Sequence, residues 1–435
     1  MALRLTTFDP GFDDTFSNLI GPRSEGGEDV TAIVSAILAD VRTEGGVALA
    51  RYTEQFDRLT INPDTLTSDA VNLIALADDC PSDLRGAIDF AAKRIAAYHQ
   101  AQMPDDHRFL DEAGVQLGWR WTPLDSVGVY VPGGRASYPS SVLMNIIPAR
   151  IAGVERIVMT APAPGGELLP AVAYAALKAG VTEYLPIGGA QAVAALAFGA
   201  GDLAPVDKIV GPGNAYVAEA KRQVFGTVGI DTIAGPSEIL VIADDTANPD
   251  WVAADLLSQC EHDPSSQAIL LTPDSDLAGK VGDAAEAQLS ELSTEAVARR
   301  AWETHSAIVV TQDLAEAAKL SNRAAPEHVE LAIRDPEGLL PEIKHAGAVF
   351  LGHHTPEALG DYVTGSNHVL PTSRAARFSS GLGLTDFMKR MSIQRATAEG
   401  FDALAPAAAR LAEAEGLPAH RRSVTVRSNR AGLNE

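Results

Sequence analysis

The stretch of residues 255–264, D-L-L-S-Q-C-E-H-D-P, combines residue types that could bind a metal ion. Apolar residues precede it with helical spacing, and Pro264 ends the predicted helix because proline lacks a backbone donor. Gln259 and His262 are three residues apart and therefore share one face of this helix. An amide oxygen beside an imidazole suits a metal site, but His262 could equally be a solvated residue that the helix dipole favours at a carboxyl end.

Three further segments pair an acidic residue with a histidine. The pairs are Glu327 with His328, Asp361 with His368, and Glu415 with His420. Each pair alone also fits a structural role, such as a solvent-facing strand start, a charge at a helix end or a core histidine. Together, an oxygen and nitrogen ligand set suited to Zn²⁺ can be drawn from Gln259, His262, Asp361 and His420. Glu327 and His328 would then be an acid/base pair beside the ion.

The amino-acid composition limits which classes of partner and which cellular compartment we expect. The chain has 435 residues and 46% apolar residues, enough for two or three soluble domains. Lys and Arg number 34 against 57 Asp and Glu, and the formal charge of −23 argues against nucleic acids and anionic membranes as partners. With two cysteines, Cys80 and Cys260, and no secretory signal at the start, we expect a cytoplasmic protein. No run of about twenty apolar residues predicts a membrane span.

Predicted strands and helices alternate over most of the chain, which is typical of parallel α/β sheets. Helices are expected over residues 29–57 and 81–98, and a strand over 115–121. Further strands are expected at 127–131, 156–160, 184–187 and 208–210, with helices at 140–152 and 169–179. Strands then follow at 239–242, 268–271, 307–310, 329–333 and 349–351.

This pattern predicts an α/β fold with two Rossmann-like parallel-sheet domains. The expected boundaries are 1–25 for a small N-terminal arm without a core, 26–126 with 237–383 for the first α/β domain, 127–236 for the second, and 384–435 for a helical C-terminal tail. The candidate metal and catalytic residues fall in the first domain. The tail is expected to end in an extended segment at 423–427 and to dock on another surface, because it is too short to bury a core alone.

Four short strands of the second domain and its border run into glycine-containing turns that open helices. The turns are V-P-G-G at 131–134, I-G-G-A at 187–190, V-G-P-G-N at 210–214 and A-G-P-S at 234–237. Loops at the carboxyl ends of parallel strands line the ligand crevice, and helix N-termini there offer free backbone N–H groups to the phosphates of a dinucleotide. Ordinary turn chemistry explains the same loops, and neither G-x-G-x-x-G nor G-x-x-x-x-G-K-[ST] occurs.

Longer motifs resemble the histidinol dehydrogenase family, the zinc- and NAD-dependent enzymes of histidine biosynthesis. They occur in order along essentially the whole chain: Y-V-P-G-G, I-G-G-A-Q-A-V-A-A-L-A, V-G-P-G-N-A-Y-V-A-E-A-K-R, I-A-G-P-S-E-I-L-V-I-A-D, L-L-S-Q-C-E-H-D, A-P-E-H-V-E-L, G-D-Y-V-T-G-S-N-H-V-L-P-T and F-S-S-G-L-G-L. The resemblance implies oxidation of L-histidinol to L-histidine through histidinaldehyde, with two NAD.

The resemblance also implies a role for each candidate site residue. The implied zinc ligands are Gln259, His262, Asp361 and His420, and the implied proton acceptors are Glu327 and His328. The implied NAD contacts are Tyr130, Gln191 and Asn214. Substrate contacts are implied for Ser237, His328, Glu415 and the four zinc ligands. The resemblance further implies an intertwined homodimer with shared active sites, in which His420 reaches the zinc of the other subunit.

Two positions depart from the expected family pattern, and three other functions stay open. Cys260 lies between two implied ligands and adds a thiol that could make the site sensitive to oxidation, and Ser366 stands where Pro or Thr is common. One alternative is a zinc/NAD dehydrogenase of another small diol. A second is a zinc hydrolase with Glu327 as base, and a third is a two-lobed binding protein. Reduction of NAD by histidinol separates the proposed activity from all three.

Overall fold

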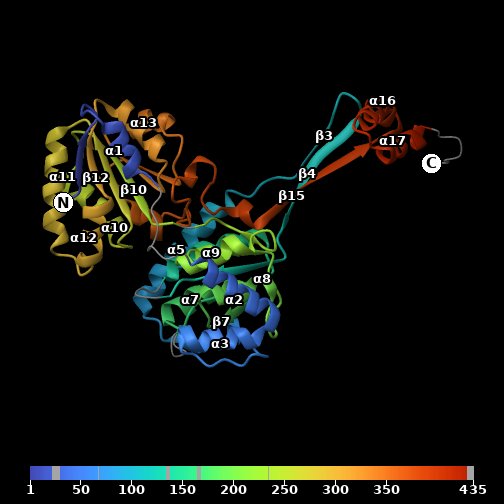
Figure 1. Ribbon diagram of the computed structural model, residues 1–435, viewed down its shortest axis with the longest axis horizontal. Coiled ribbons are helices and arrows are strands. Elements are labelled where there is room, and N and C mark those ends of the chain that lie inside the picture. Colours follow the sequence, from blue (N-terminus) through green and yellow to red (C-terminus); the bar gives the residue numbers. More distant parts are fainter. Residues whose placement is uncertain (22–29, 67, 134–137, 164–167, 234, 429–435) are drawn as a thin grey trace. The chain divides into compact units, whose positions relative to one another are not determined.

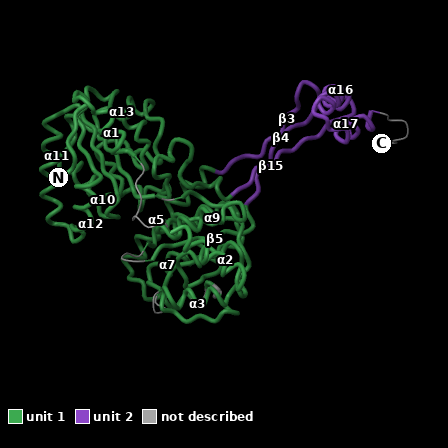
Figure 2. Tube along the Cα trace, in the orientation of Figure 1, with its two compact units in different colours: residues 1–102, 124–387 green, residues 103–123, 388–435 purple. Residues whose placement is uncertain are grey.

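A computed structural model describes residues 1–21, 30–66, 68–133, 138–163, 168–233 and 235–428. The chain forms two compact units, which Figure 2 colours separately. The main unit comprises residues 1–102 and 124–387, and the tail unit comprises residues 103–123 and 388–435.

The first sheet of the main unit has six parallel strands in the order β1-β12-β11-β10-β13-β14. They are β1 (Leu3–Thr6), β12 (Ala307–Val310), β11 (Gln267–Thr272), β10 (Glu238–Ala243), β13 (His328–Ala332) and β14 (Ala348–Leu351). β10, β11 and β13 are buried along their whole length. Parallel strands covered on both faces have continuous apolar runs, and for this reason the sequence located these strands within one residue at each end.

Helices cover both faces of this sheet, as Figure 1 shows. One hydrophobic cluster contains α10 (Pro249–Cys260), α11 (Ser275–Leu289) and α12 (Glu295–His305). The other contains α1 (Phe12–Leu19) and α13 (Leu314–Ala324). Shorter elements follow: α14 (Pro336–Leu339), η3 (Leu340–Glu342), α15 (Glu357–Tyr362), η4 (Ala375–Arg377) and η5 (Leu384–Phe387).

The second sheet has the order β2-β7-β6-β5-β8-β9 and is parallel except for β2. Its strands are β2 (Ser68–Asp69), β7 (Glu183–Leu185), β6 (Arg156–Thr160), β5 (Ser126–Tyr130), β8 (Lys208–Val210) and β9 (Gly229–Ile230). One cluster joins it to α2 (Thr31–Glu44), α3 (Gly46–Asp57), α8 (Gly189–Phe198) and α9 (Ala215–Val224). Packed together beside them are η1 (Ala70–Leu73), α4 (Ile74–Asp78), α5 (Ser82–Gln100), α6 (Pro139–Ala152) and α7 (Pro170–Ala179).

The N-terminal helices differ from the predicted domain boundaries. Residues 26–126 were predicted to belong with the first sheet, whereas α2 and α3 contribute to the core of the second sheet. The apolar stripe of α2, including Val34, Ile37 and Val41, packs in one cluster with Ala195 and Leu196 of α8. An amphipathic helix presents an apolar face to some sheet, but its spacing does not say which one.

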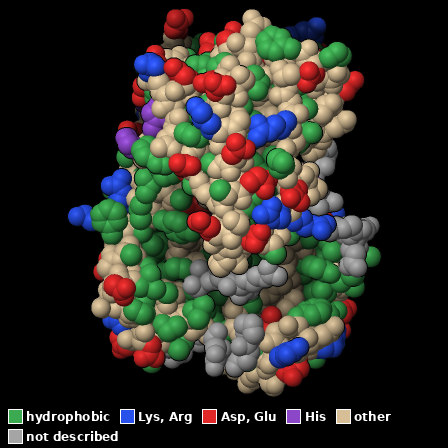
Figure 3. Space-filling view, turned by 90° about the vertical axis from the view of Figure 1, so that its left-hand side faces the viewer, with side chains coloured by type: hydrophobic (Ala, Val, Ile, Leu, Met, Phe, Trp, Pro, Cys, Tyr) green, Lys and Arg blue, Asp and Glu red, His purple; other side chains and the backbone are tan. Residues whose placement is uncertain are grey.

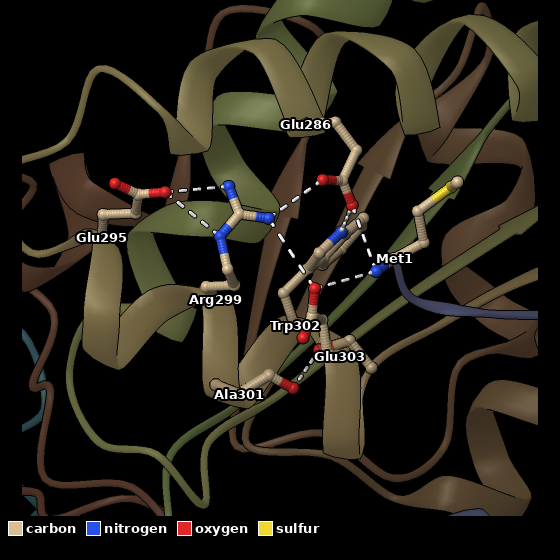
Figure 4. A network of polar contacts seen from close by, with 8 residues as sticks. Met1, Glu286, Glu295, Arg299, Ala301, Trp302 and Glu303 are labelled. Carbon is tan, nitrogen blue, oxygen red and sulfur yellow. Dashed lines mark hydrogen bonds and ion pairs between the residues drawn. The ribbon is translucent and has the colours of Figure 1, made fainter.

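The predicted N-terminal arm is part of the first sheet. β1 pairs with β12, and Phe12 and Phe16 stack in the core with ring centroids 5.5 Å apart. The Met1 ammonium binds Glu286 and Glu303 within a larger polar network around α11 and α12, shown in Figure 4. β1 was not predicted because an exposed edge strand lacks the continuous apolar run that marks interior strands.

The tail unit joins an antiparallel sheet to two helices. Its strands have the order β15-β4-β3 and are β15 (Met388–Ala396), β4 (Val115–Pro123) and β3 (His107–Leu110). Its helices are α16 (Ala398–Ala414) and α17 (Pro418–Thr425), followed by η6 (Val426–Ser428). The tail therefore begins with a strand rather than a helix, and residues 423–427 are helical rather than extended. β15 is fixed by nine residues of pairing with β4, a partner that lies far away in the sequence.

The surface charge is mixed on the face drawn in Figure 3, where acidic side chains are interspersed with Lys, Arg and apolar groups. Across the described parts of the chain, no helix has the length and apolar content needed to cross a membrane.

Candidate active site

Six of the predicted site residues line one cavity of about 250 Å³ in the main unit. They are Ser237, Gln259, His262, Glu327, His328 and Asp361. Ser237 and Glu327 directly precede β10 and β13, and Gln259 and His262 lie at the carboxyl end of α10. The cavity therefore opens at the amino ends of the first sheet's strands, and the fold brings together residues spread over more than 120 positions of sequence.

Glu327 and His328 both reach this cavity because the backbone bends at Glu327 before β13 begins. Without this bend, neighbouring residues on a strand would face opposite sides. The Glu238 N–H donates to Glu327 Oε2 at 3.0 Å, and the Glu327 N–H donates to Glu238 Oε2 at 3.3 Å. This reciprocal pairing between two strand starts fixes the position of the Glu327 carboxyl.

The tautomer of His328 follows from its one hydrogen bond. Its Nδ1 lies 2.9 Å from the carbonyl oxygen of Glu238, which can only accept, so Nδ1 carries the proton. Nε2 is buried, has no hydrogen-bond partner, and keeps its lone pair. Burial lowers the pKa of His328, and Glu357, with Oε1 3.8 Å from Nε2, raises it in part. The ring is therefore a neutral imidazole with an unoccupied basic nitrogen facing the cavity.

Burial also raises the pKa of Glu327 well above its ordinary value, although the Glu238 N–H opposes the rise. The nearby charges of Glu238, Asp361 and Glu357 add to the increase. A carboxylate with a raised pKa is a stronger proton acceptor than a solvated one, which suits a general base.

Several buried acceptors that suit a cation lie in the cavity lining or, for Glu357, next to lining residues. Gln259 is 1% exposed and its Oε1 has no partner, and Glu357 Oε1 is likewise unpartnered. Ligand atoms of His328, Glu357 and Asp361 all lie within 4.8 Å of one another. Burial raises the pKa of Asp361 well above its ordinary value, and Glu357 raises it further. Unpaired buried acceptors and crowded carboxyls are costly, and a divalent cation would relieve both costs.

The predicted ligand set and this cluster overlap at Asp361. Gln259 and His262 line the same cavity, although the residue His262 is largely exposed.

Glu357 was not predicted as a site residue from the sequence. It lies at the start of α15, where an acid ordinarily offsets the helix dipole at the surface, and its sequence context gave no sign of burial. Of its two oxygens, Oε2 accepts from Ser258 Oγ at 3.3 Å.

His368 anchors the loop that carries Asp361. Its Nδ1 lies 3.0 Å from the Asp361 carbonyl, which can only accept, so Nδ1 carries the proton of the neutral ring. Nε2 is then the acceptor, and the Ser141 hydroxyl donates to it at 3.2 Å. Burial lowers the pKa of His368 to about 4, and the ring stays neutral. His368 thus fixes the backbone of an implied ligand through two hydrogen bonds.

A second cavity of about 620 Å³ is lined by all three implied NAD contacts, Tyr130, Gln191 and Asn214. These residues lie at or after the carboxyl ends of β5, β7 and β8, where the sequence analysis expected a ligand crevice. Pro132 lines both cavities, so the two are neighbours. Gln191 is 1% exposed and its Nε2 has no partner.

The helix N-termini in this cavity are capped by side chains rather than free, contrary to the expectation for phosphate binding. Asn214 Oδ1 accepts from the N–H groups of Tyr216 and Val217, which leaves its NH₂ for a ligand. The Gly189 N–H donates to the Tyr130 hydroxyl at 3.0 Å. Burial raises the pKa of Tyr130 to about 12, so the hydroxyl keeps its own proton for donation.

The two departures from the family pattern lie away from the chemistry. Cys260 is fully buried in the cluster of α10, α11 and α12, with Sγ 3.7 Å from Ser306 Oγ. Burial raises its pKa to about 12, so the thiol stays protonated and the suggested oxidation sensitivity has no support. Ser366 Oγ lies 3.3 Å from Thr364 Oγ1.

Glu415 and His420 belong to the tail unit, where Glu415 caps the end of α16 and His420 lies in α17. Both side chains are exposed. Their implied roles in the site therefore stay predictions.

Comparison with known proteins decides the family. A family model described as histidinol dehydrogenase matches residues 22–428. The chain belongs to the histidinol dehydrogenase family. Histidinol dehydrogenase of Cereibacter sphaeroides is 56% identical over 431 residues, covering 99% of both chains, and that of Caulobacter vibrioides is 55% identical over 419 residues, covering 96% of this chain and 97% of the relative.

A solved structure agrees with this assignment. The crystal structure of histidinol dehydrogenase from Elizabethkingia anophelis is similar with a TM-score of 0.94 and 37% identity, covering 99% of both chains. The resemblance inferred from the sequence motifs is thereby confirmed, as is an α/β fold with parallel sheets and C-terminal helices.

Proposed function

We propose that this protein is a zinc- and NAD-dependent histidinol dehydrogenase, which oxidises L-histidinol to L-histidine through histidinaldehyde. One observation carries the proposal: two neighbouring cavities that share Pro132. One holds a neutral imidazole with a free nitrogen beside unpartnered oxygens, and the other holds unpartnered polar groups suited to a dinucleotide. The relatives at 55–56% identity carry the same name over essentially their whole length.

The ligands for zinc would be Gln259, His262 and Asp361 in the main unit, with His420 from a second copy of the chain. The unpartnered Gln259 oxygen and the raised pKa of Asp361 both fit a cation at this place. When bound, zinc would supply a template that holds the amine and imidazole nitrogens of the substrate. Glu357 adds a buried carboxylate beside Asp361 and His328, with one ligand atom of each within 4.8 Å of the others.

Each of the two oxidations removes one hydride from the same carbon and one proton from an oxygen, that of the hydroxyl first and that of the added water second. In the first, His328 Nε2 accepts the hydroxyl proton while the hydride leaves for NAD, and the alcohol becomes an aldehyde. Water then adds to the aldehyde, and Glu327 accepts its proton. The hydrate anion that remains transfers a second hydride to a second NAD, which gives the acid. His328 suits the first step because its basic nitrogen is already deprotonated in the ground state.

The test is an absorbance assay for NADH with zinc-loaded protein, NAD and L-histidinol. We expect NADH formation with histidinol and with supplied histidinaldehyde, and little with other small diols. NADH formation with another diol but not with histidinol would favour a sister dehydrogenase. Turnover of a substrate without NAD would favour a hydrolase, and binding without turnover would favour a binding protein.

A further inference from the structure

The proposed cofactor cavity contains one acidic side chain, Asp57, at the last position of α3. Among the described residues that line the cavity, Asp57 is the charged one, and the others are apolar, amide or hydroxyl side chains and glycines. A dinucleotide carries both anionic phosphates and neutral ribose hydroxyls. A carboxylate repels the first and accepts hydrogen bonds from the second, so its position constrains which part of the cofactor lies there.

Asp57 lies at the N-terminus of α8. Its Oδ2 accepts from the Gly188 N–H at 3.3 Å, and the neighbouring Gly189 N–H is taken by Tyr130. A bare helix N-terminus is suited to a phosphate, but here a carboxylate already occupies it. This corner of the cavity therefore favours hydrogen-bond donors over anions.

The cavity lining beside Asp57 also contains two hydrogen-bond donors, Gln191 and Tyr130. Gln191 is 1% exposed, and its Nε2 makes no hydrogen bond of ordinary length. Burial raises the pKa of Asp57, and the Gln191 amide lies close enough to that carboxyl to lower it. The Tyr130 hydroxyl accepts from Gly189 and has its proton left to donate. A carboxylate acceptor next to two donors matches a ribose, whose hydroxyls both donate and accept.

We propose that Asp57 recognises the 2′- and 3′-hydroxyls of the adenosine ribose and makes the enzyme selective for NAD over NADP. This inference rests on the proposed function, because it assumes that the cavity binds a nicotinamide dinucleotide. In dinucleotide-binding folds an acid commonly binds the 2′-hydroxyl, and a 2′-phosphate instead needs a nearby cation. The 2′-phosphate of NADP would bring a second anion against Asp57, with no described Lys or Arg in the lining to offset it.

The test compares NAD and NADP on wild type, Asp57→Asn and a control variant, Glu54→Gln. Glu54 lies one helical turn earlier on α3, is exposed, and does not line the cavity. Asparagine keeps an oxygen for the Gly188 N–H, and thermal melting of each variant reports on folding. Affinities come from calorimetric titration, and kcat/KM comes from histidinol oxidation with each dinucleotide.

We expect wild type and Glu54→Gln to prefer NAD by at least about tenfold in both measurements, and Asp57→Asn to lose at least about tenfold of that preference. An unchanged preference in folded Asp57→Asn would overturn the inference, as would equal affinities in wild type. If wild type oxidises histidinol with NAD but Asp57→Asn keeps the same preference for NAD over NADP, the inference fails and the proposed function stands. If the dinucleotides bind with Asp57-dependent preference but histidinol is not oxidised, the proposed function fails alone.

Discussion

His328 is prepared as a base by a single hydrogen bond from its own Nδ1 to the Glu238 carbonyl. Because that carbonyl can only accept, the free lone pair must be on Nε2, which faces the cavity without a partner. Glu327 is held by the backbone of the same residue, Glu238, through a different atom. The two candidate bases are thus positioned separately, although they are adjacent in sequence.

Separate positioning predicts separate effects on the two half-reactions. We expect His328→Asn to slow oxidation of histidinol to the aldehyde by about 10²–10⁴-fold, the usual contribution of a general base. We expect Glu327→Gln chiefly to slow oxidation of supplied histidinaldehyde, because it removes the acceptor for the proton of water. Stopped-flow NADH absorbance with each substrate measures both rates. Equal losses on both substrates in both variants would contradict a division of labour.

The individual candidate residues were predictable to different degrees. Residues embedded in long motifs, such as Gln259 and His328, were found from sequence, and the fold brings them to one cavity. Glu357 was missed because its importance depends on burial, which the fold alone creates. Cys260 was misjudged for the same reason, since its neighbour Gln259 faces the cavity while its own thiol faces the core.

The turn after β8 contributes residues to both cavities, Gly211 to the first and Asn214 to the second, and is held by a buried ion pair. Lys221 Nζ donates to the Gly211 carbonyl at 2.9 Å, and the Gly211 N–H donates to Asp231 Oδ2 at 2.7 Å. Lys221 and Asp231 also bind each other, and each side chain is 2% exposed. Gly211 has φ +111, and a Cβ there would lie 2.1 Å from the Tyr130 carbonyl oxygen. Backbone and ion pair thus fix the turn that leads to Asn214.

Breaking this pair should cost stability. We expect Lys221→Met to lower the free energy of unfolding by about 3–5 kcal/mol, because it leaves the Asp231 charge buried without a partner. The double variant Lys221→Met/Asp231→Leu should recover a large part of the loss, since it removes the unpaired charge. Urea unfolding followed by circular dichroism measures all three proteins. A single variant as stable as wild type would show that the pair does not hold the turn.

The interior strands, the edge strand β14 and the tail strand β4 were predictable from sequence, whereas β1 and β15 were not. Buried parallel strands such as β6 and β8 have apolar runs bounded by turns, and their predicted ranges match the structure at both ends. β15 was taken as helical because its alternating, mostly exposed side chains depend on β4 for pairing. The packing of α2 on the second sheet could not be predicted either, because the apolar stripe of a helix does not show which sheet it packs against.

At the scale of the whole molecule, two predicted residues of the candidate active site, Glu415 and His420, belong to the tail unit. It buries few side chains and leaves large apolar ones exposed, among them Leu110, Leu411 and Leu417. Because this unit buries so few side chains, docking on a further surface would bury more of its apolar area. In the proposed two-fold homodimer with exchanged tails, the partner would supply that surface, and His420 and Glu415 would reach the partner's cavity.

This arrangement predicts complementation between inactive variants. His262→Asn and His420→Asn homodimers should each be nearly inactive, because every site lacks one ligand. When the two are unfolded and refolded together, random pairing makes about half the dimers mixed, and each mixed dimer has one intact site. About a quarter of wild-type activity should return. A site built within one chain would give no recovery, and light scattering checks that each variant is dimeric.

The central claim is that one metal-dependent site carries out both oxidations. The most direct measurement follows NADH formed per histidinol consumed, in protein stripped with a chelator and in the same protein after Zn²⁺ is restored. We expect about one zinc per chain in the active protein, loss of activity on chelation and recovery with Zn²⁺. We also expect two NADH for each histidinol, as two hydride transfers require. Full activity in metal-free protein, or a ratio of one NADH with histidinaldehyde as the final product, would contradict the account.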